Sequence, residues 1–355
     1  QEYVKRIDEW LNEEIDIDPD GQYSERSVSI YSPTVDNMLL TTGIHLNHSE
    51  LLDVVRKNLD MTLYYIQPGG EVLTEASNRQ DSAQIGYVNS YYYAYRYFAI
   101  KDKNPVYAAV CELIENLMPE LITRYISELL EDPIFNEDLM PASKIPDDYF
   151  KRFSYSSVTR IRRGDVDISV IEHNPTFLVF MKGSAVLQSV RLASSFFGKR
   201  GQFISGRAKL EGNKIILTKS AKHGYFQPYT EINGEFKQLI SEVQTMDYRV
   251  EISEIDAKVT VEIDIHGTPH VPVSLEMSFR PEGELSGVVA DKNLEDAYFL
   301  EGGMGQYKHG DDTITFGPGI ASHKWAEIRG MLQKQDGMSV YLTGYTPFKH
   351  TLELS

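Results

Sequence analysis

The chain has 355 residues, 41% hydrophobic and 25% charged, a composition typical of a folded protein long enough for two domains. Its 35 basic and 52 acidic residues give a net charge of −17. This charge argues against a nucleic-acid-binding protein, which needs a broad basic surface. No apolar run approaches the roughly 18 residues of a membrane span. The chain opens on a polar segment without a signal peptide, so a processed secreted protein and a cytoplasmic one both stay open.

The first 132 residues are predicted to form helices. Apolar residues recur at helical spacing over 4–15, and Ser49 and Asn104 are residue types that commonly begin helices. Loops of variable length separate these segments, without a fixed repeat period. The pattern predicts an α-helical domain over 1–132 that is built from stacked helical hairpins.

An aromatic helix is predicted over 85–100. Tyr87, Tyr91 and Tyr95 are four residues apart and would share one helix face. Such a stripe fits a packed face as well as a functional one.

The pattern then changes from helical spacing to alternation. Residues 133–154 are rich in Pro and Asp, which predicts a linker. Residues 155–355 alternate apolar and polar side chains between turn signals such as Asn233-Gly234, which predicts a large antiparallel β-sandwich. Within it, 235–246 has helical spacing and is predicted to be a short helix.

Two segments resemble the heparinase II/III-like polysaccharide lyases. Residues 20–31, DGQYSERSVSIY, are similar to that family's DGxxFERSxxYH motif. Residues 157–183 are similar to the segment that opens the family's β-sandwich. The resemblance implies an α+β multidomain fold, in which the last part of an α/α toroid precedes the sandwich. It also implies an acidic, uronate-containing polysaccharide or oligosaccharide as substrate and a periplasmic or secreted location, and it leaves the oligomeric state open.

The implied chemistry is β-elimination at a uronic acid. The sugar carboxylate must be neutralised, a base must remove the C5 proton, and an acid must protonate the departing glycosidic oxygen. Side chains can perform all three tasks, so no metal or other cofactor is expected.

The resemblance also implies the residues of the site. Tyr87 and His173 fall where the family has catalytic residues, and Tyr31 stands where it usually has His. Glu25 matches the motif's Glu and would bind the substrate carboxylate. Each of these side chains also has an ordinary structural interpretation, as a helix-packing Tyr, a strand-start His or an ion-paired Glu.

Four further residues are predicted to bind substrate. Asn78 and Arg79 lie in the loop before the aromatic helix, and Arg160 and Arg162 begin a basic stretch of the β-region. On an acidic chain, local cations can form a groove for a polyanion, although they also suit solvated strand faces.

Two other functions stay open. One is a non-catalytic carbohydrate-binding protein on the same scaffold, favoured by the Tyr at position 31. The other is a glycoside hydrolase with paired carboxylates, for which Glu25, Asp81 and Glu172 are the candidates.

Overall fold

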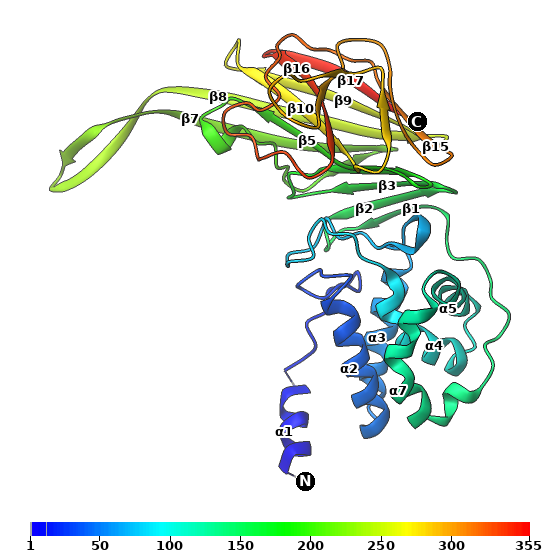
Figure 1. Cartoon of the computed structure of the whole chain (residues 1–355). Coiled ribbons are helices and arrows are strands. Elements are labelled where there is room, and N and C mark those ends of the chain that lie inside the picture. Colours follow the sequence, from blue (N-terminus) through cyan, green and yellow to red (C-terminus); the bar gives the residue numbers. More distant parts are fainter. Residues whose placement is uncertain (1, 12) are drawn as a thin grey trace. The chain divides into compact units, whose positions relative to one another are not determined.

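The computed structural model describes residues 2–11 and 13–355, and the chain folds as two compact units, 1–161 and 162–355 (Figure 1). The division falls inside strand β2. The elements that begin in the first unit are α1 Glu2–Leu11, α2 Tyr31–Leu46, α3 Ser49–Thr62, α4 Tyr92–Lys101, α5 Pro105–Leu117, α6 Pro119–Ile122, α7 Ile126–Glu131, β1 Asp148–Phe153 and β2 Val158–Arg163.

Local sequence explains where the helices of the first unit begin and end. Asn104 accepts hydrogen bonds from the backbone N–H groups of Val106 and Tyr107, so it caps α5 as predicted. Helix α2 ends at Asn47, which adopts the left-handed conformation common after a helix. None of the helices in the described part of the chain has the length and apolar character needed to cross a lipid bilayer.

Two of the three tyrosines of the aromatic stripe pack in the core of the first unit. Tyr91 and Tyr95 are buried, and their hydroxyls donate to the carbonyls of Val28 at 2.7 Å and Leu59 at 2.9 Å. Tyr87 precedes the helical turns and stands apart from the other two. The predicted helix over 85–100 was therefore too long at its start, because a 3₁₀ turn over Val88–Tyr91 leads into α4.

The segment 133–154, predicted as a linker, has little regular structure in its middle. It begins with a 3₁₀ turn over Pro133–Asn136 and ends in β1.

The second unit is built of strands. They are β3 Val166–Ile171, β4 Leu178–Lys182, β5 Ala185–Ser194, β6 Lys209–Glu211, β7 Lys214–Ile232, β8 Glu235–Ile255, β9 Lys258–Gly267, β10 Pro272–Phe279, β11 Glu284–Ser286, β12 Val289–Ala290, β13 Ala297–Phe299, β14 Gly305–His309, β15 Asp312–Gly317, β16 Met338–Tyr345 and β17 Phe348–Leu354.

These strands form two sheets. In the second unit one sheet runs in the order β3-β4-β5-β10-β16-β13-β12 and the other in the order β11-β14-β15-β17-β9-β8-β7-β6. Strands β3 and β10 are buried along nearly their whole length, whereas β9 buries alternate residues, as expected for a strand with one face on the core. The pairing is antiparallel except between β13 and β16. The predicted fold class, helices followed by a large antiparallel sandwich, is confirmed.

The longest hairpin corrects one prediction. Asn233 and Gly234 form its turn, both with positive φ, as such a dipeptide predicts. Residues 235–246 are not a helix, because they belong to β8, which pairs with β7 from Lys214 opposite Ser253 to Ile232 opposite Glu235. The outer part of this hairpin extends beyond the sheet as a two-stranded ribbon (Figure 1).

Candidate functional site

The motif segment 20–31 is held tightly against the first unit. Gly21 has a φ of 99°, and a Cβ at this position would lie 2.5 Å from the carbonyl oxygen of Lys57 in α3, so a larger residue does not fit. Asp20 accepts a hydrogen bond of 2.6 Å from the backbone N–H of Tyr155. The Asp-Gly pair of the motif therefore fixes the course of the backbone.

Beneath the candidate site, Asp81 joins two loops through its carboxylate. The carboxylate accepts hydrogen bonds from the hydroxyls of Ser27 and Ser29, both at 2.8 Å, and of Ser77 at 2.5 Å. Burial raises the pKa of Asp81, but the hydrogen bonds from the three serines outweigh burial and lower it below its usual range. Asp81 is therefore a buried, ionised anchor.

Backbone contacts hold the same two loops side by side. The backbone N–H of Asn78 donates to the carbonyl of Glu25 at 3.1 Å, and the Asn78 amide donates to the carbonyl of Ser24 at 3.3 Å. Farther along the loop, a Cβ on Gly86 would lie 2.4 Å from that of Ser29. The motif segment and the loop before α4 thus form one structure.

This structure carries a group of four polar side chains, here called the Tyr31 cluster: Glu25, Tyr31, Arg79 and Gln80. Gln80 donates to the Tyr31 hydroxyl at 2.9 Å and Arg79 donates to it at 3.4 Å. The Arg79 guanidinium also lies over the Tyr31 ring, 4.9 Å from its centroid, and 3.8 Å from the Glu25 carboxylate. The hydrogen bond from Arg79, followed by that from Gln80, lowers the pKa of Tyr31 below that of an ordinary tyrosine.

Tyr87 lies at the end of the same loop. Its side chain is 37% exposed, and its backbone is extended just before the 3₁₀ turn. Within the described part of the chain, its side chain has no hydrogen bond and no ring contact. Tyr87 thus presents a free hydroxyl one residue after Gly86.

His173 belongs to the second unit. It lies in the turn between β3 and β4, is exposed, and has a φ of 57°. The adjacent Glu172 is buried and accepts a hydrogen bond of 2.9 Å from the backbone N–H of Ala208. His173 is therefore available to solvent, whereas Glu172 supports the fold.

The two predicted arginines after the linker are not free cations. Arg160 is fully buried and donates from Nε to the carbonyl of Tyr64 at 2.8 Å. Arg162 bonds to the carbonyl of Gly164 at 2.6 Å and to the buried Asp167 at 3.3 Å. Because Arg160 is buried and Arg162 is paired within its own unit, neither guanidinium group offers its charge to a polysaccharide.

The structure thus brings together four of the predicted site residues, Glu25, Tyr31, Asn78 and Arg79, and their role in a site stays a prediction. Sequence reasoning missed Gln80 as a donor to Tyr31 and the serines as partners of Asp81. The only signal was the serine-rich ERSVS stretch, which does not reveal a partner 52 or 54 residues away. Among the described residues there is no group of three or more His, Cys, Asp or Glu side chains arranged to hold a metal ion.

Comparison with known proteins gives similarity at the level of structure only. No family model and no curated protein matches the chain. A solved structure described as a heparinase III gene product superposes with a TM-score of 0.50 and 14% sequence identity, covering 99% of this chain and 54% of its own. A heparan sulfate lyase from Pedobacter heparinus reaches a TM-score of 0.46 at 10% identity, covering 98% of this chain and 54% of its own.

The chain therefore spans about half the length of these structures and shares a heparinase-like fold with the first. At this identity the similarity concerns the fold. Any activity depends on the side chains that this chain places on the fold.

Proposed function

We propose that the chain is a polysaccharide lyase that cleaves a uronate-containing polysaccharide by β-elimination, with the Tyr31 cluster at its reactive centre. The observation that supports this most is the Tyr31 hydroxyl, which accepts hydrogen bonds from Arg79 and Gln80 and has a lowered pKa. A tyrosine of this kind is ionised more readily near neutral pH and is suited to remove a proton. The heparinase-like fold supports the same class of reaction.

In the proposed reaction Tyr31, as the phenolate, takes the proton from C5 of the uronate. The electron pair left on C5 forms the C4–C5 double bond, and the bond from C4 to the glycosidic oxygen breaks. Negative charge develops on the sugar carboxylate as the proton leaves, and Arg79 and Asn78 are suited to stabilise it. Tyr87 is proposed to protonate the departing oxygen, since its side chain is partly exposed on the same loop and its hydroxyl has no partner among the described residues.

The exposed Glu25–Arg79 pair fits a role in substrate binding. At 3.8 Å, with both side chains 43% exposed, it is a weak surface ion pair. A uronate carboxylate can replace Glu25 as the partner of Arg79. The catalytic role of His173 and a periplasmic or secreted location remain predictions.

A hydrolase with paired carboxylates is less well supported. Its general acid would need a carboxyl with a raised pKa. The pKa of Asp81 is lowered, and its oxygens are occupied by three serine hydroxyls. Glu172 is buried and bonded to the backbone.

The test uses the full natural protein and a panel of heparan sulfate, chondroitin, hyaluronan, alginate and ulvan. β-Elimination creates an unsaturated uronate, whose ultraviolet absorbance is followed over time. We expect absorbance to rise on at least one substrate, and kcat to fall roughly 10²-fold or more in Tyr31→Phe or Tyr87→Phe. Tyr3→Phe, an exposed tyrosine of the same unit outside the cluster, is the matched control and should be unchanged.

Three results would count against the proposal in different ways. Full activity in Tyr31→Phe removes Tyr31 from the chemistry. New reducing ends without an unsaturated product indicate a hydrolase. Binding of a polysaccharide without any product, in protein shown to be folded, indicates a carbohydrate-binding protein.

A further inference from the structure

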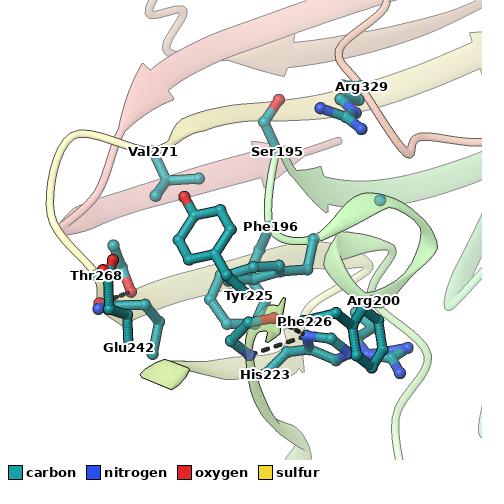
Figure 2. A pocket seen from close by; sticks show the side chains of 14 residues that line it. Ser195, Phe196, Arg200, His223, Tyr225, Phe226, Glu242, Thr268, Val271 and Arg329 are labelled. Carbon is teal, nitrogen blue, oxygen red and sulfur yellow. Dashed lines mark hydrogen bonds between the residues drawn. The ribbon is translucent and has the colours of Figure 1, made fainter. Parts of the chain in front are cut away.

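The second unit contains a cavity of about 740 Å³ at the base of the β7/β8 hairpin (Figure 2). Five segments that are far apart in the sequence line it: 195–200, 223–226, 242–244, 268–271 and Arg329. All of them belong to one unit, so its shape is fixed within that unit. Its volume lies within the roughly 300–1,000 Å³ typical of small-molecule sites.

Aromatic rings form one connected group around this cavity. The ring of Phe197 lies 5.0 Å from that of His223 and 5.3 Å from that of Tyr225, and His223 lies 5.2 Å from Phe226. Tyr225 and Phe226 are more than half exposed, at 59% and 57%. Apolar rings held open to solvent are suited to stack on the C–H face of a sugar ring, because a flat apolar surface is buried on contact.

Charged side chains complete the lining. In the part of the chain that the structure describes, the side chains of Arg200, Arg329 and Glu242 have no ion pair and no hydrogen bond. The two arginines stand on segments in direct contact, since a Cβ on Gly330 would lie 2.1 Å from the carbonyl oxygen of Gly198.

Some other exposed cations of the same unit are paired with carboxylates. Lys324 pairs with Glu301, and Lys349 pairs with Asp264 at 3.0 Å. On a chain with a net charge of −17, two cations that line one cavity without an internal partner are suited to bind an anion.

Two residues of the lining have an unfavourable backbone conformation. Phe197 has a φ of 43° and Glu242 a φ of 51°, in the left-handed region that side chains with a Cβ rarely adopt. Such residues persist where the surrounding structure fixes them, and they occur preferentially at functional sites. Both line this cavity.

We propose that this cavity binds a short anionic saccharide. Its rings stack on the sugar faces, Arg200 and Arg329 bind carboxylate or sulfate groups, and Glu242 accepts hydrogen bonds from hydroxyls. The choice of saccharide class rests on the proposed function, because the ligand would be a stretch of the acidic polysaccharide that the chain cleaves.

The test measures binding by isothermal titration calorimetry with the full natural protein. The probe is a heparan sulfate hexasaccharide, and maltohexaose is the neutral comparison. We expect the Arg200→Ala/Arg329→Ala double variant to lose one binding event per chain, or to raise Kd about tenfold where a single event is seen. The matched double control, Lys292→Ala/Lys308→Ala, removes two exposed cations outside the cavity and should stay within twofold of the wild type.

Phe226→Ala gives a second, uncharged test of the same site and should also weaken hexasaccharide binding. Because the Phe226 side chain is exposed, its removal should leave the fold intact, and weaker binding would then reflect the site itself. Tyr31→Phe should bind at the cavity as the wild type does, because Tyr31 belongs to the other unit.

Absorbance of the unsaturated product is read in the same samples, which separates the two proposals. Turnover together with unchanged binding in the double arginine and Phe226→Ala variants overturns the cavity proposal and leaves the lyase proposal standing. Binding that is lost in these variants, without turnover by any form, supports the cavity and removes the lyase proposal. Equal binding of maltohexaose overturns the assignment to an anionic saccharide.

Discussion

The Tyr31 cluster of the first unit and the cavity of the second use charge in opposite ways. In the cluster, Arg79 contacts both Glu25 and Tyr31, and Asp81 beneath it accepts three serine hydroxyls. In the cavity, Arg200 and Arg329 have no such partners among the described residues. Paired charges hold reactive groups in a fixed geometry before a substrate arrives, whereas unpaired charges are available to bind one.

The contacts of Asp81 beneath the cluster also differ from those within the Tyr31 cluster. Asp81 is buried and its hydrogen bonds are buried or partly buried, which makes the loss of any partner costly. The Glu25–Arg79 pair is long and exposed, so solvent screens it and a ligand can exchange with it. We therefore expect substitutions at Asp81 to act on stability and substitutions around Tyr31 to act on turnover.

The largest expected effect is on the stability of the first unit. Asp81→Ala leaves the hydroxyls of Ser27, Ser29 and Ser77 without their acceptor, and we expect it to lower the free energy of unfolding by about 3 kcal/mol. Urea denaturation should show a lower midpoint for this unit. Asp138→Ala, which removes an exposed carboxylate from the same unit, should change the midpoint little.

The pH dependence of this effect has a defined sign. The pKa of Asp81 is lower in the folded chain than the usual value of about 3.9, so its contribution is fully present above that pH. The contribution is lost as the pH falls through the lower folded pKa. The difference in the free energy of unfolding between wild type and Asp81→Ala should therefore narrow there. A difference in the free energy of unfolding under about 1 kcal/mol at neutral pH would contradict this prediction, and would show that water can replace the carboxylate as acceptor.

The second expected effect is on catalysis. Arg79→Ala removes the main cause of the lowered Tyr31 pKa, so the phenolate forms at higher pH. We expect turnover at neutral pH to fall roughly tenfold and the rising limb of the pH–rate profile to move toward that of an ordinary tyrosine, near about 10. Arg79→Lys keeps the positive charge, so its turnover and its pH–rate profile should lie between those of the wild type and Arg79→Ala. An unmoved profile in Arg79→Ala would mean that Tyr31 is not the titrating group.

Sequence alone predicted much of the first unit because its signals are local. Asn104 caps a helix two residues downstream, and the 20–31 motif places Tyr31 beside a loop that the resemblance already associated with the site. The aromatic stripe was ambiguous for the same reason. Spacing shows that Tyr91 and Tyr95 share a face, but not that their hydroxyls bond to backbone carbonyls elsewhere in the unit.

The cavity could not be predicted, since its walls come together only through pairing of distant segments. Apolar residues at 236, 239, 240 and 243 have helical spacing, which predicted a helix over 235–246, now seen to be part of strand β8. The Asn-Gly turn before it commits the segment to pair with β7 instead. Arg200 and Arg329 are separated by more than a hundred residues, and only the close contact of Gly198 with Gly330 brings their segments to the same cavity.

The smallest expected effect tests which property of the cluster matters most. Gln80→Leu removes one uncharged donor, 2.9 Å from the Tyr31 hydroxyl, and leaves the Arg79 guanidinium in place. A neutral hydrogen bond stabilises the phenolate less than a cation does, so we expect turnover to fall only about threefold. The pH–rate profile should shift in the same direction as in Arg79→Ala, but by less. Because Gln80 is exposed, the urea midpoint should not change. A larger loss in Gln80→Leu than in Arg79→Ala would reverse the order, and would mean that the shorter hydrogen bond, rather than the nearby positive charge, sets the acidity of Tyr31.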